Sequence, residues 1–456
     1  MTLLPYIILL CICICGFVLT LKISQFNLFD PVPLLFLGFS VSIFLALVGT
    51  LSWNMVSLTI LPVAILLIGL CGAAGAAFFF QRVIAVHIDS SSDKPAVRKS
   101  LNAFQLDDPI WKYLVAVLLV AIAVSLRIHE TYVIGNQLGF ATNDFGSLSS
   151  QVRQVTESFI DSSAMKMNVG FSFAERQMEK VVWAIGFVGA YLVAQGIVSR
   201  NKNRLMPAAV VVLSTWLFYL IAGGRGTIIY QLIAILCTVF IGYCKNHEAK
   251  AVFKKVFVIG ALVAIGAALC MYLASYIIGR PASGGPISYI SFYFGGSVPS
   301  LELLIDGNFQ ADESILGINT FYSLFSPLFK FGVIDSYPNY SITWVFLNGY
   351  ASNIFTCFAR YYLDFGLIGV AILSFAASLL STLFFRLGNK SGNYILGILI
   401  GYFSAFVFDS AREEFLFSRL ISLSQILLIL VIILTAIFFS NKVCLPKKTP
   451  KSLTEN

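Results

Sequence analysis

The sequence predicts an all-α polytopic membrane protein, a helical bundle of about 11 transmembrane helices with a large periplasmic loop. Its composition is 58% hydrophobic and 11% charged, whereas a soluble domain has about 25% charged residues. Long apolar runs recur from the first residues to about residue 440, and each approaches the ~20 residues that a helix needs to cross the hydrocarbon core. The runs are continuous and do not alternate as strands do, which favours helices over a β-barrel.

Eleven spans are expected within a single transmembrane domain that covers residues 1–456. The first lacks a basic n-region and a small-residue cleavage pattern, so we expect it to be retained and not removed as a signal peptide. The expected spans cover approximately residues 3–21, 32–52, 57–80, 112–129, 180–199, 205–222, 227–244, 256–278, 364–385, 393–409 and 418–440.

The distribution of charge predicts the orientation, because cytoplasmic loops of membrane proteins carry an excess of Lys and Arg. With the C-terminus in the cytoplasm, the cytoplasmic segments hold 19 basic and 7 acidic residues, and the other side holds 11 basic and 15 acidic residues. We therefore expect a multi-pass protein of the bacterial cell inner membrane with a cytoplasmic C-terminus.

Two long loops are expected on the periplasmic side, at residues 130–179 and 279–363. The second is rich in Gly, Pro, Tyr and Phe and is too apolar to stay solvated as a free linker. We expect it to pack over the bundle as short helices and to form the roof of a cavity that opens sideways to the membrane lipid.

Several functional classes are disfavoured by what the sequence lacks. Its basic residues are scattered over many short loops, whereas nucleic-acid binding needs a clustered basic face, so no nucleic-acid partner is expected. His87, His129 and His247 share no ligand spacing and no CxxC pair occurs, so we expect no metal site. No phosphate-binding loop of an ATP-driven machine is present, and no cofactor is expected.

A glycine-rich turn, residues 222–227, joins the sixth and seventh expected spans on the periplasmic side. Its glycines allow the backbone to approach a ligand closely, and Arg225 would follow at the start of a helix. Exposed backbone amides together with a guanidinium suit a diphosphate or a carboxylate. The alternative is a tight turn whose arginine reaches the lipid headgroups.

The connection between the last two spans places five charges in residues 409–419. If this segment is helical, Asp409 and Glu413 share a face, and Arg412 and Arg419 lie two turns apart and can hold one anion between them. A carboxylate buried beside two arginines is expected to have a lowered pKa. The alternative is a solvated turn whose ion pairs satisfy each other and contribute little.

Two further arginines are expected at the same end of the bundle, Arg280 after the eighth span and Arg360 before the ninth. Each alone is as typical of an interfacial anchor as of a ligand-binding residue. Together with Arg225, Arg412 and Arg419 they predict a cationic pocket at the outer leaflet, which suits a lipid-linked diphosphate.

Three short motifs, in order along the chain, resemble those of the oligosaccharide repeat-unit polymerases, which assemble O-antigen and related surface polysaccharides. Residues 223–226 resemble the glycine-arginine turn of that family. The stretch from Asn353 to Gly369 is similar to its Asn-x-aromatic-Thr pattern followed by Asp-Phe-Gly-x-x-Gly. Residues 411–413 with 418–419 resemble the late periplasmic hairpin of enterobacterial common antigen polymerases. The resemblance covers about residues 215–425, and the interior of the long loop has no counterpart.

The resemblance implies a glycosyltransferase of lipopolysaccharide biosynthesis that transfers a glycan from undecaprenyl diphosphate to an incoming lipid-linked repeat unit. The donor carries its own leaving group, so neither a nucleotide sugar nor ATP is required. A polysaccharide chain-length regulator is an expected partner. The alternatives are an O-antigen ligase and a lipid-linked oligosaccharide flippase or other transporter.

Each candidate residue has an expected role in this reaction. Arg225, Arg280, Arg412 and Arg419 are expected to bind the diphosphate, with Arg360 and Asn353 as further candidates. Glu413 or Asp409 is expected to accept the proton, and Asp364 is held as a reserve base.

Overall fold

The computed structural model describes residues 3–50, 56–84, 109–140, 144–158, 170–277, 285–307, 315–335, 343–347 and 350–440. The long helices are α1 (Leu4–Ile23), α2 (Pro31–Gly49), α3 (Ile60–Phe79) with the π-helical turn η1 (Phe80–Ile84), α5 (Ile110–Gln137), α7 (Phe173–Ser199), α8 (Lys202–Ala222), α9 (Arg225–Cys244), α10 (Ala249–Ile277), α14 (Cys357–Ser391), α15 (Tyr394–Asp409) and α16 (Leu423–Phe439). The shorter elements are α6 (Phe145–Ser158), α11 (Gly285–Gly295), α12 (Ser297–Asp306), α13 (Tyr322–Lys330), the strands β1 (Val345–Leu347) and β2 (Tyr350–Ser352), and the π-helical turn η6 (Leu416–Leu420).

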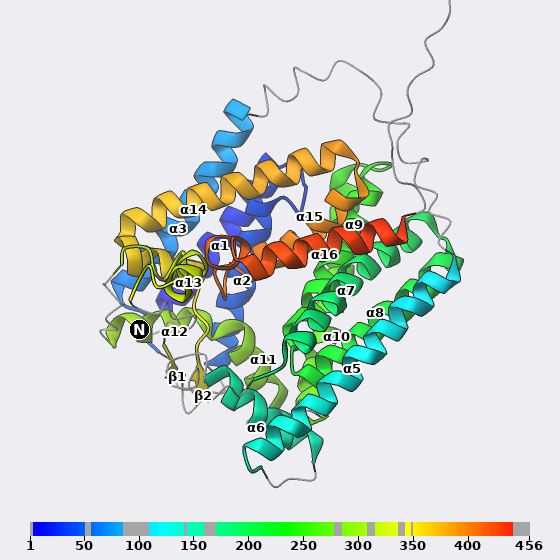
Figure 1. Ribbon diagram of the computed structural model, residues 1–456. Helices are drawn as coiled ribbons and strands as arrows, with labels where there is room; N and C mark the ends of the chain where they lie inside the picture. Colours follow the sequence, from blue (N-terminus) through cyan, green and yellow to red (C-terminus); the bar gives the residue numbers. More distant parts are fainter. Residues whose placement is uncertain are drawn as a thin grey trace, which may run out of the picture.

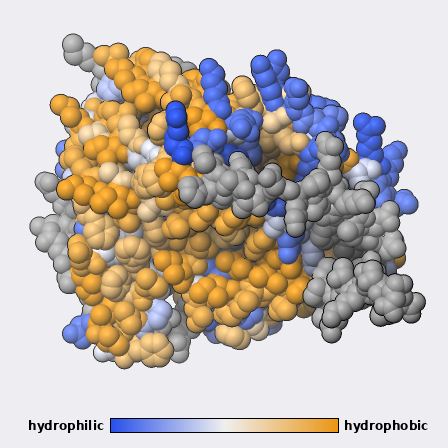
Figure 2. Space-filling view, turned by 90° about the horizontal axis from the view of Figure 1, so that it is seen from above, coloured by the Kyte–Doolittle hydropathy of each residue, from blue (hydrophilic) through white to orange (hydrophobic). Residues whose placement is uncertain are grey.

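The protein is an all-α membrane bundle, as the sequence predicts. Within the described residues, nine helices are long and apolar enough to cross a bilayer, and α15 and α16 are shorter apolar helices. Together these eleven helices correspond one for one to the expected spans. Large apolar side chains are widely exposed on them, up to 88% for Ile60. Figure 2 shows one face on which apolar side chains cover most of the described surface and hydrophilic ones gather along an edge.

Several helices extend beyond their expected ends because polar residues there find partners. Helix α5 reaches Gln137 and α7 begins at Phe173, where apolar composition alone predicted limits of 129 and 180. In the added turns of α7 the Glu175 carboxylate accepts a hydrogen bond from the Arg127 guanidinium of α5 at 2.6 Å. The pairing supplies the partner that a buried carboxylate needs, in turns that lack the composition of a span.

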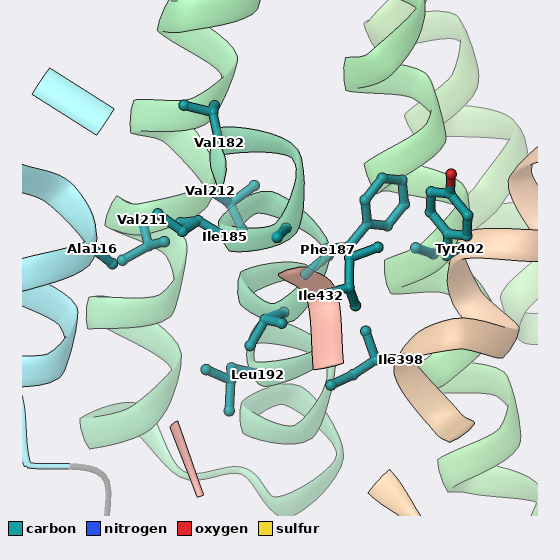
Figure 3. Close-up of a cluster of buried hydrophobic side chains, with 14 of the residues drawn as sticks. Ala116, Val182, Ile185, Phe187, Leu192, Val211, Val212, Ile398, Tyr402 and Ile432 are labelled. Carbon is teal, nitrogen blue, oxygen red and sulfur yellow. The ribbon is translucent and has the colours of Figure 1, made fainter. Parts of the chain in front are cut away.

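Helix α7 is the central element of the larger of two helical groups. It packs against α8, α9, α16, α5 and α15 (Figure 1). Ile185, Phe187 and Leu192 of α7 meet Val212 of α8 and Tyr402 of α15 in one buried cluster (Figure 3). The Phe187 and Tyr402 ring centroids lie 4.9 Å apart, edge to face, which is a favourable aromatic geometry.

The second group is formed by α1, α2, α3 and α14. Its core contains Phe39 of α2, stacked on Phe358 of α14 with ring centroids 5.0 Å apart, together with Leu66 and Leu70 of α3. The side-chain packing of this group fixes the first turn of α14, which contributes to the candidate site.

The segment expected at residues 279–363 forms short helices and one β-hairpin against the bundle in its described parts, and its last residues, from Cys357, belong to α14. Helix α11 lies along α2, α12 contacts α2, α3 and β1, and α13 contacts η6. The strands β1 and β2 form a two-stranded antiparallel hairpin in which Val345 pairs with Ser352. Figure 1 shows α11, α12, α13 and the hairpin gathered at one end of the bundle, near the start of α1.

Helix α14 is interrupted once. Gly366 has φ +64° and ψ −160°, a conformation open essentially to glycine alone. The interruption separates a short first part, which carries Arg360, from the long remainder of the helix. The direction of that first part is therefore set by its own contacts and not by the axis of the spanning helix.

Candidate functional site

A polar cavity of about 190 Å³ lies at the end of the bundle where α9 and α14 begin and α15 ends. Its wall holds two cations, three carboxylates and two tyrosines. The lining residues are Gly226, Tyr230, Tyr293, Asn353, Ile354, Phe355, Thr356, Arg360, Asp409, Arg412, Glu413 and Glu414.

Arg412 is held in the cavity wall by the turn that ends α15. Its backbone N–H donates to the Asp409 carbonyl at 2.7 Å, and its guanidinium donates to the Asp409 carboxylate at 2.9 Å. Tyr230 donates its hydroxyl to the other Asp409 oxygen at 2.6 Å, and the Tyr293 ring centroid lies 4.5 Å from the guanidinium carbon. The buried Nε of Arg412 has no hydrogen-bond partner within the described residues, so the contacts described here do not use all of its donors.

Glu413 lies beside Arg412 but pairs with a different arginine. The chain does not continue as an α-helix after Asp409, and Arg419 of η6 donates to the Glu413 carboxylate at 2.5 Å. Arg412 and Arg419 therefore each hold a carboxylate of their own, and Arg419 is not among the residues that line the cavity. The expectation that both arginines share one anion does not describe this arrangement.

The lowered pKa expected for a buried carboxylate beside two arginines was also wrong for Glu413. Desolvation by the surrounding protein raises the pKa of Glu413 to about 7, against the opposing effects of Arg360 and Arg412 and with Asp409 adding to the increase. The loss of hydration outweighs the attraction of the cations. A carboxylate with a pKa near neutral is a better proton acceptor than one held well below it.

Arg360 lines the cavity, whereas Asp364, one turn further along α14, does not. The Asp364 carboxylate accepts hydrogen bonds from the Asn319 amide side chain at 2.9 Å and from the Thr320 backbone N–H at 2.5 Å. Arg360 in turn donates to the Asn319 carbonyl at 2.8 Å. Asp364 thus fixes residues 319–320, which in turn hold Arg360 in place, and its position gives no support to the role of reserve base.

The glycine-rich turn reaches the same cavity. Gly223 ends α8 with φ +73°, in the left-handed region that favours glycine, and α9 begins at Arg225 as expected. Gly226 and Asn353 both contribute to the cavity wall. The side chain of Arg225, and Arg280 as a whole, lie outside the described residues.

Two lining residues were given no role by the sequence analysis: Tyr230 and Glu414. Tyr230 follows Gly226 by one helical turn, so the i, i+4 spacing along α9 was a usable signal. Glu414 accepts hydrogen bonds from the Tyr361 hydroxyl at 3.0 Å and from the Ser418 backbone N–H at 2.6 Å. These contacts couple α14, the turn after α15 and η6.

An apolar cavity of about 330 Å³ adjoins the polar one and shares Glu414 with it. Its lining runs along α14 from Cys357 to Phe385 and along α15 from Ile400 to Val407, and it includes Ser410 just after α15. Pro31 and Leu35 of α2 complete the wall. Phenylalanine, leucine and small serine side chains make up most of the wall. The two cavities together provide a charged compartment at the end of the bundle and an elongated apolar compartment between its helices.

Comparisons with protein-family models, with curated proteins and with solved structures found no match to this chain.

Proposed function

We propose that the protein is a glycosyltransferase that polymerises undecaprenyl-diphosphate-linked oligosaccharide repeat units into O-antigen or a related surface polysaccharide. The observation that carries this proposal is the pair of adjoining cavities. Arg360 and Arg412 line a polar compartment that meets an elongated apolar one at Glu414. This combination suits an amphiphile with an anionic headgroup and a long hydrocarbon chain, because guanidinium groups bind phosphate oxygens and apolar walls remove the chain from water.

In this reaction the C1–O bond between the donor sugar and the diphosphate breaks as a new C1–O bond forms to a hydroxyl of the acceptor sugar. Arg412 and Arg360, which line the polar cavity, stabilise the charge that grows on the departing undecaprenyl diphosphate. Glu413 accepts the proton that leaves the acceptor hydroxyl. Asp409 and Tyr230 orient Arg412 through the contacts described above.

The proposed location is the periplasmic face of the bacterial inner membrane, with the C-terminus in the cytoplasm. The polar cavity lies at the end of the bundle opposite the turn between α9 and α10, which is flanked by Lys245, Lys250, Lys254 and Lys255. An excess of basic residues is typical of cytoplasmic loops. A chain-length regulator that assembles with the polymerase in the membrane is a further proposed partner.

The test is deletion of the gene followed by separation of lipopolysaccharide on a gel. Loss of a polymerase leaves the core with a single repeat unit, whereas loss of a ligase or a flippase leaves the core alone. Return of the full ladder with the wild-type gene on a plasmid controls for effects on neighbouring genes. A deletion strain with an unchanged ladder, or with core alone, contradicts the proposal.

A further inference from the structure

A third cavity, of about 460 Å³, lies at the same end of the bundle between the first turns of α7 and α16. We call it the side cavity. It shares no residue with the polar or the apolar cavity. Its lining residues are Phe173, Arg176, Gln177, Glu179, Lys180, Trp183, Ser424, Gln425 and Leu428.

The side cavity combines one large aromatic surface with closely spaced donors and acceptors. Trp183 is half-buried, and its indole N–H donates no hydrogen bond within the described residues. Lys180 and Gln177 are held on one turn of α7 by a hydrogen bond of 3.1 Å. Gln425 faces them from α16 and is fixed by the Tyr402 hydroxyl at 2.7 Å. A site of this kind offers an apolar surface and specific polar groups at once.

The charges of the side cavity distinguish it from the polar cavity. Arg176 and Lys180 contribute two cations, and the Glu179 carboxylate adds an acceptor that forms no ion pair within the described residues. An unpaired carboxylate opposes the binding of a diphosphate but accepts hydrogen bonds from hydroxyl groups. A sugar ring matches both the aromatic and the polar parts of the side cavity. Its C–H groups pack on an indole, and its hydroxyls both donate and accept hydrogen bonds.

The side cavity is separated from the polar cavity by a single aromatic layer. The Trp183 ring centroid lies 6.4 Å from that of Tyr230, and the Tyr230 hydroxyl donates to Asp409 in the polar cavity. The Phe406 ring stacks on Trp183 with centroids 6.5 Å apart and contacts Tyr230 in a tilted arrangement at 4.9 Å. A ligand in the side cavity is therefore close to, but distinct from, a headgroup in the polar cavity.

We propose that the side cavity is a carbohydrate-binding subsite, with Trp183 as the surface for a sugar ring and Glu179, Arg176 and Gln425 as hydrogen-bonding partners of its hydroxyls. The proposal rests on the proposed function only for the identity of the glycan, a repeat-unit oligosaccharide. The binding itself requires no diphosphate and no reaction, so it can be measured separately.

The experiment uses the full-length protein in lipid nanodiscs and one probe, the free oligosaccharide released by mild acid from the lipid carrier of a polymerase-deficient strain. Its binding is followed by tryptophan fluorescence. The wild-type protein should bind the probe, and Glu179→Leu should weaken binding at least 10-fold. Trp183→Phe should remove most of the fluorescence change, whereas Trp216→Phe, a matched control outside the cavity, should retain it.

Two further arms separate this proposal from the proposed function. Arg412→Lys, in the polar cavity, should bind the free oligosaccharide as the wild type does, and inorganic pyrophosphate should not displace the probe. Absence of binding to the wild type, equal binding by Glu179→Leu, or displacement by pyrophosphate would overturn the subsite. A wild-type protein that polymerises in the gel assay but does not bind the probe would contradict the subsite alone.

Discussion

Two buried ion pairs at the same end of the bundle have the same chemistry but different surroundings. Arg127 pairs with Glu175, and their side chains are 10% and 2% exposed. Arg412 pairs with Asp409, and theirs are 11% and 10% exposed. The first pair lines none of the three cavities described above, and the Arg127 guanidinium lies 3.6 Å from the Phe171 ring centroid. The second pair forms part of a cavity wall.

This difference shows what a charge at the end of a membrane helix signifies. An arginine there fastens two helices when it lies packed between them, and it suits a ligand when it lines a cavity. Arg127 is of the first kind and joins α5 to α7. Arg412 is of the second kind, because it lines the polar cavity.

The largest expected effect is a loss of stability when the pair of Arg127 and Glu175 is broken. Arg127→Met leaves the Glu175 carboxylate buried without its cation, which costs roughly 3–5 kcal/mol in such pairs. A thermal-unfolding measurement in detergent should show a large decrease in Tm. The double variant Arg127→Met/Glu175→Leu should recover most of the loss, since no unpaired charge remains. A single variant as stable as the wild type would show that the pair does not fasten α5 to α7.

The next largest effect is a loss of activity when Arg412, which pairs with Asp409, is replaced. Arg412→Lys keeps the charge but loses the planar guanidinium, so polymer synthesis should fall roughly 100-fold, as when one preorganised donor is removed from an active site. The decrease in Tm should be smaller than for Arg127→Met. Arg386→Lys is the matched control, because Arg386 pairs with Asp30 at 2.7 Å at the other end of the bundle. Equal polymer from both variants would contradict a role of Arg412 in binding the diphosphate.

The smallest effect is a change in pH dependence. Because the pKa of Glu413 is about 7, the wild-type rate should rise with pH and level off above about 7, where the base is ionised. Glu413→Gln should be slower and lack this transition. A wild-type rate that is flat between about pH 6 and 8 would rule out Glu413 as the proton acceptor.

The raised pKa of Glu413 also makes the folded protein less stable as the pH rises. The folded-state pKa of Glu413 lies above its ordinary value of 4.5, so the protonated form favours the folded state. This contribution is fully present below about pH 4.5 and is lost as the pH rises through about 7. The Tm of Glu413→Gln should therefore decline less over this range than that of the wild type.

The fold was predictable because span length and apolar composition are properties of contiguous residues. The eleven spans, and the start of α9 at Arg225, follow from such local patterns. The ends of α5 and α7 were misplaced, since the pairing of Arg127 with Glu175 joins residues 48 positions apart. Composition cannot show a contact of this kind.

The candidate site was only partly predictable for the same reason. The sequence indicated Arg412, Asp409 and Glu413 because they are neighbours in one hairpin, and all three line the polar cavity. It placed Asp364 among the candidate bases, which its position does not support. The sequence could not show that Asn319 and Thr320 donate hydrogen bonds to this carboxylate, because those contacts depend on tertiary structure. It gave no indication of Tyr230, whose contact with Asp409 depends on how α9 packs against α15.

The interruption of α14 at Gly366 affects how a mutational scan of this protein should be interpreted. A Cβ added there would meet no atom within 4 Å, yet its φ of +64° with ψ near −160° excludes other residues. Gly366 should therefore tolerate substitution as poorly as the residues of the polar cavity, although it is not one of them. Intolerance at this position would reflect backbone conformation, and it would not by itself mark a residue that contacts substrate.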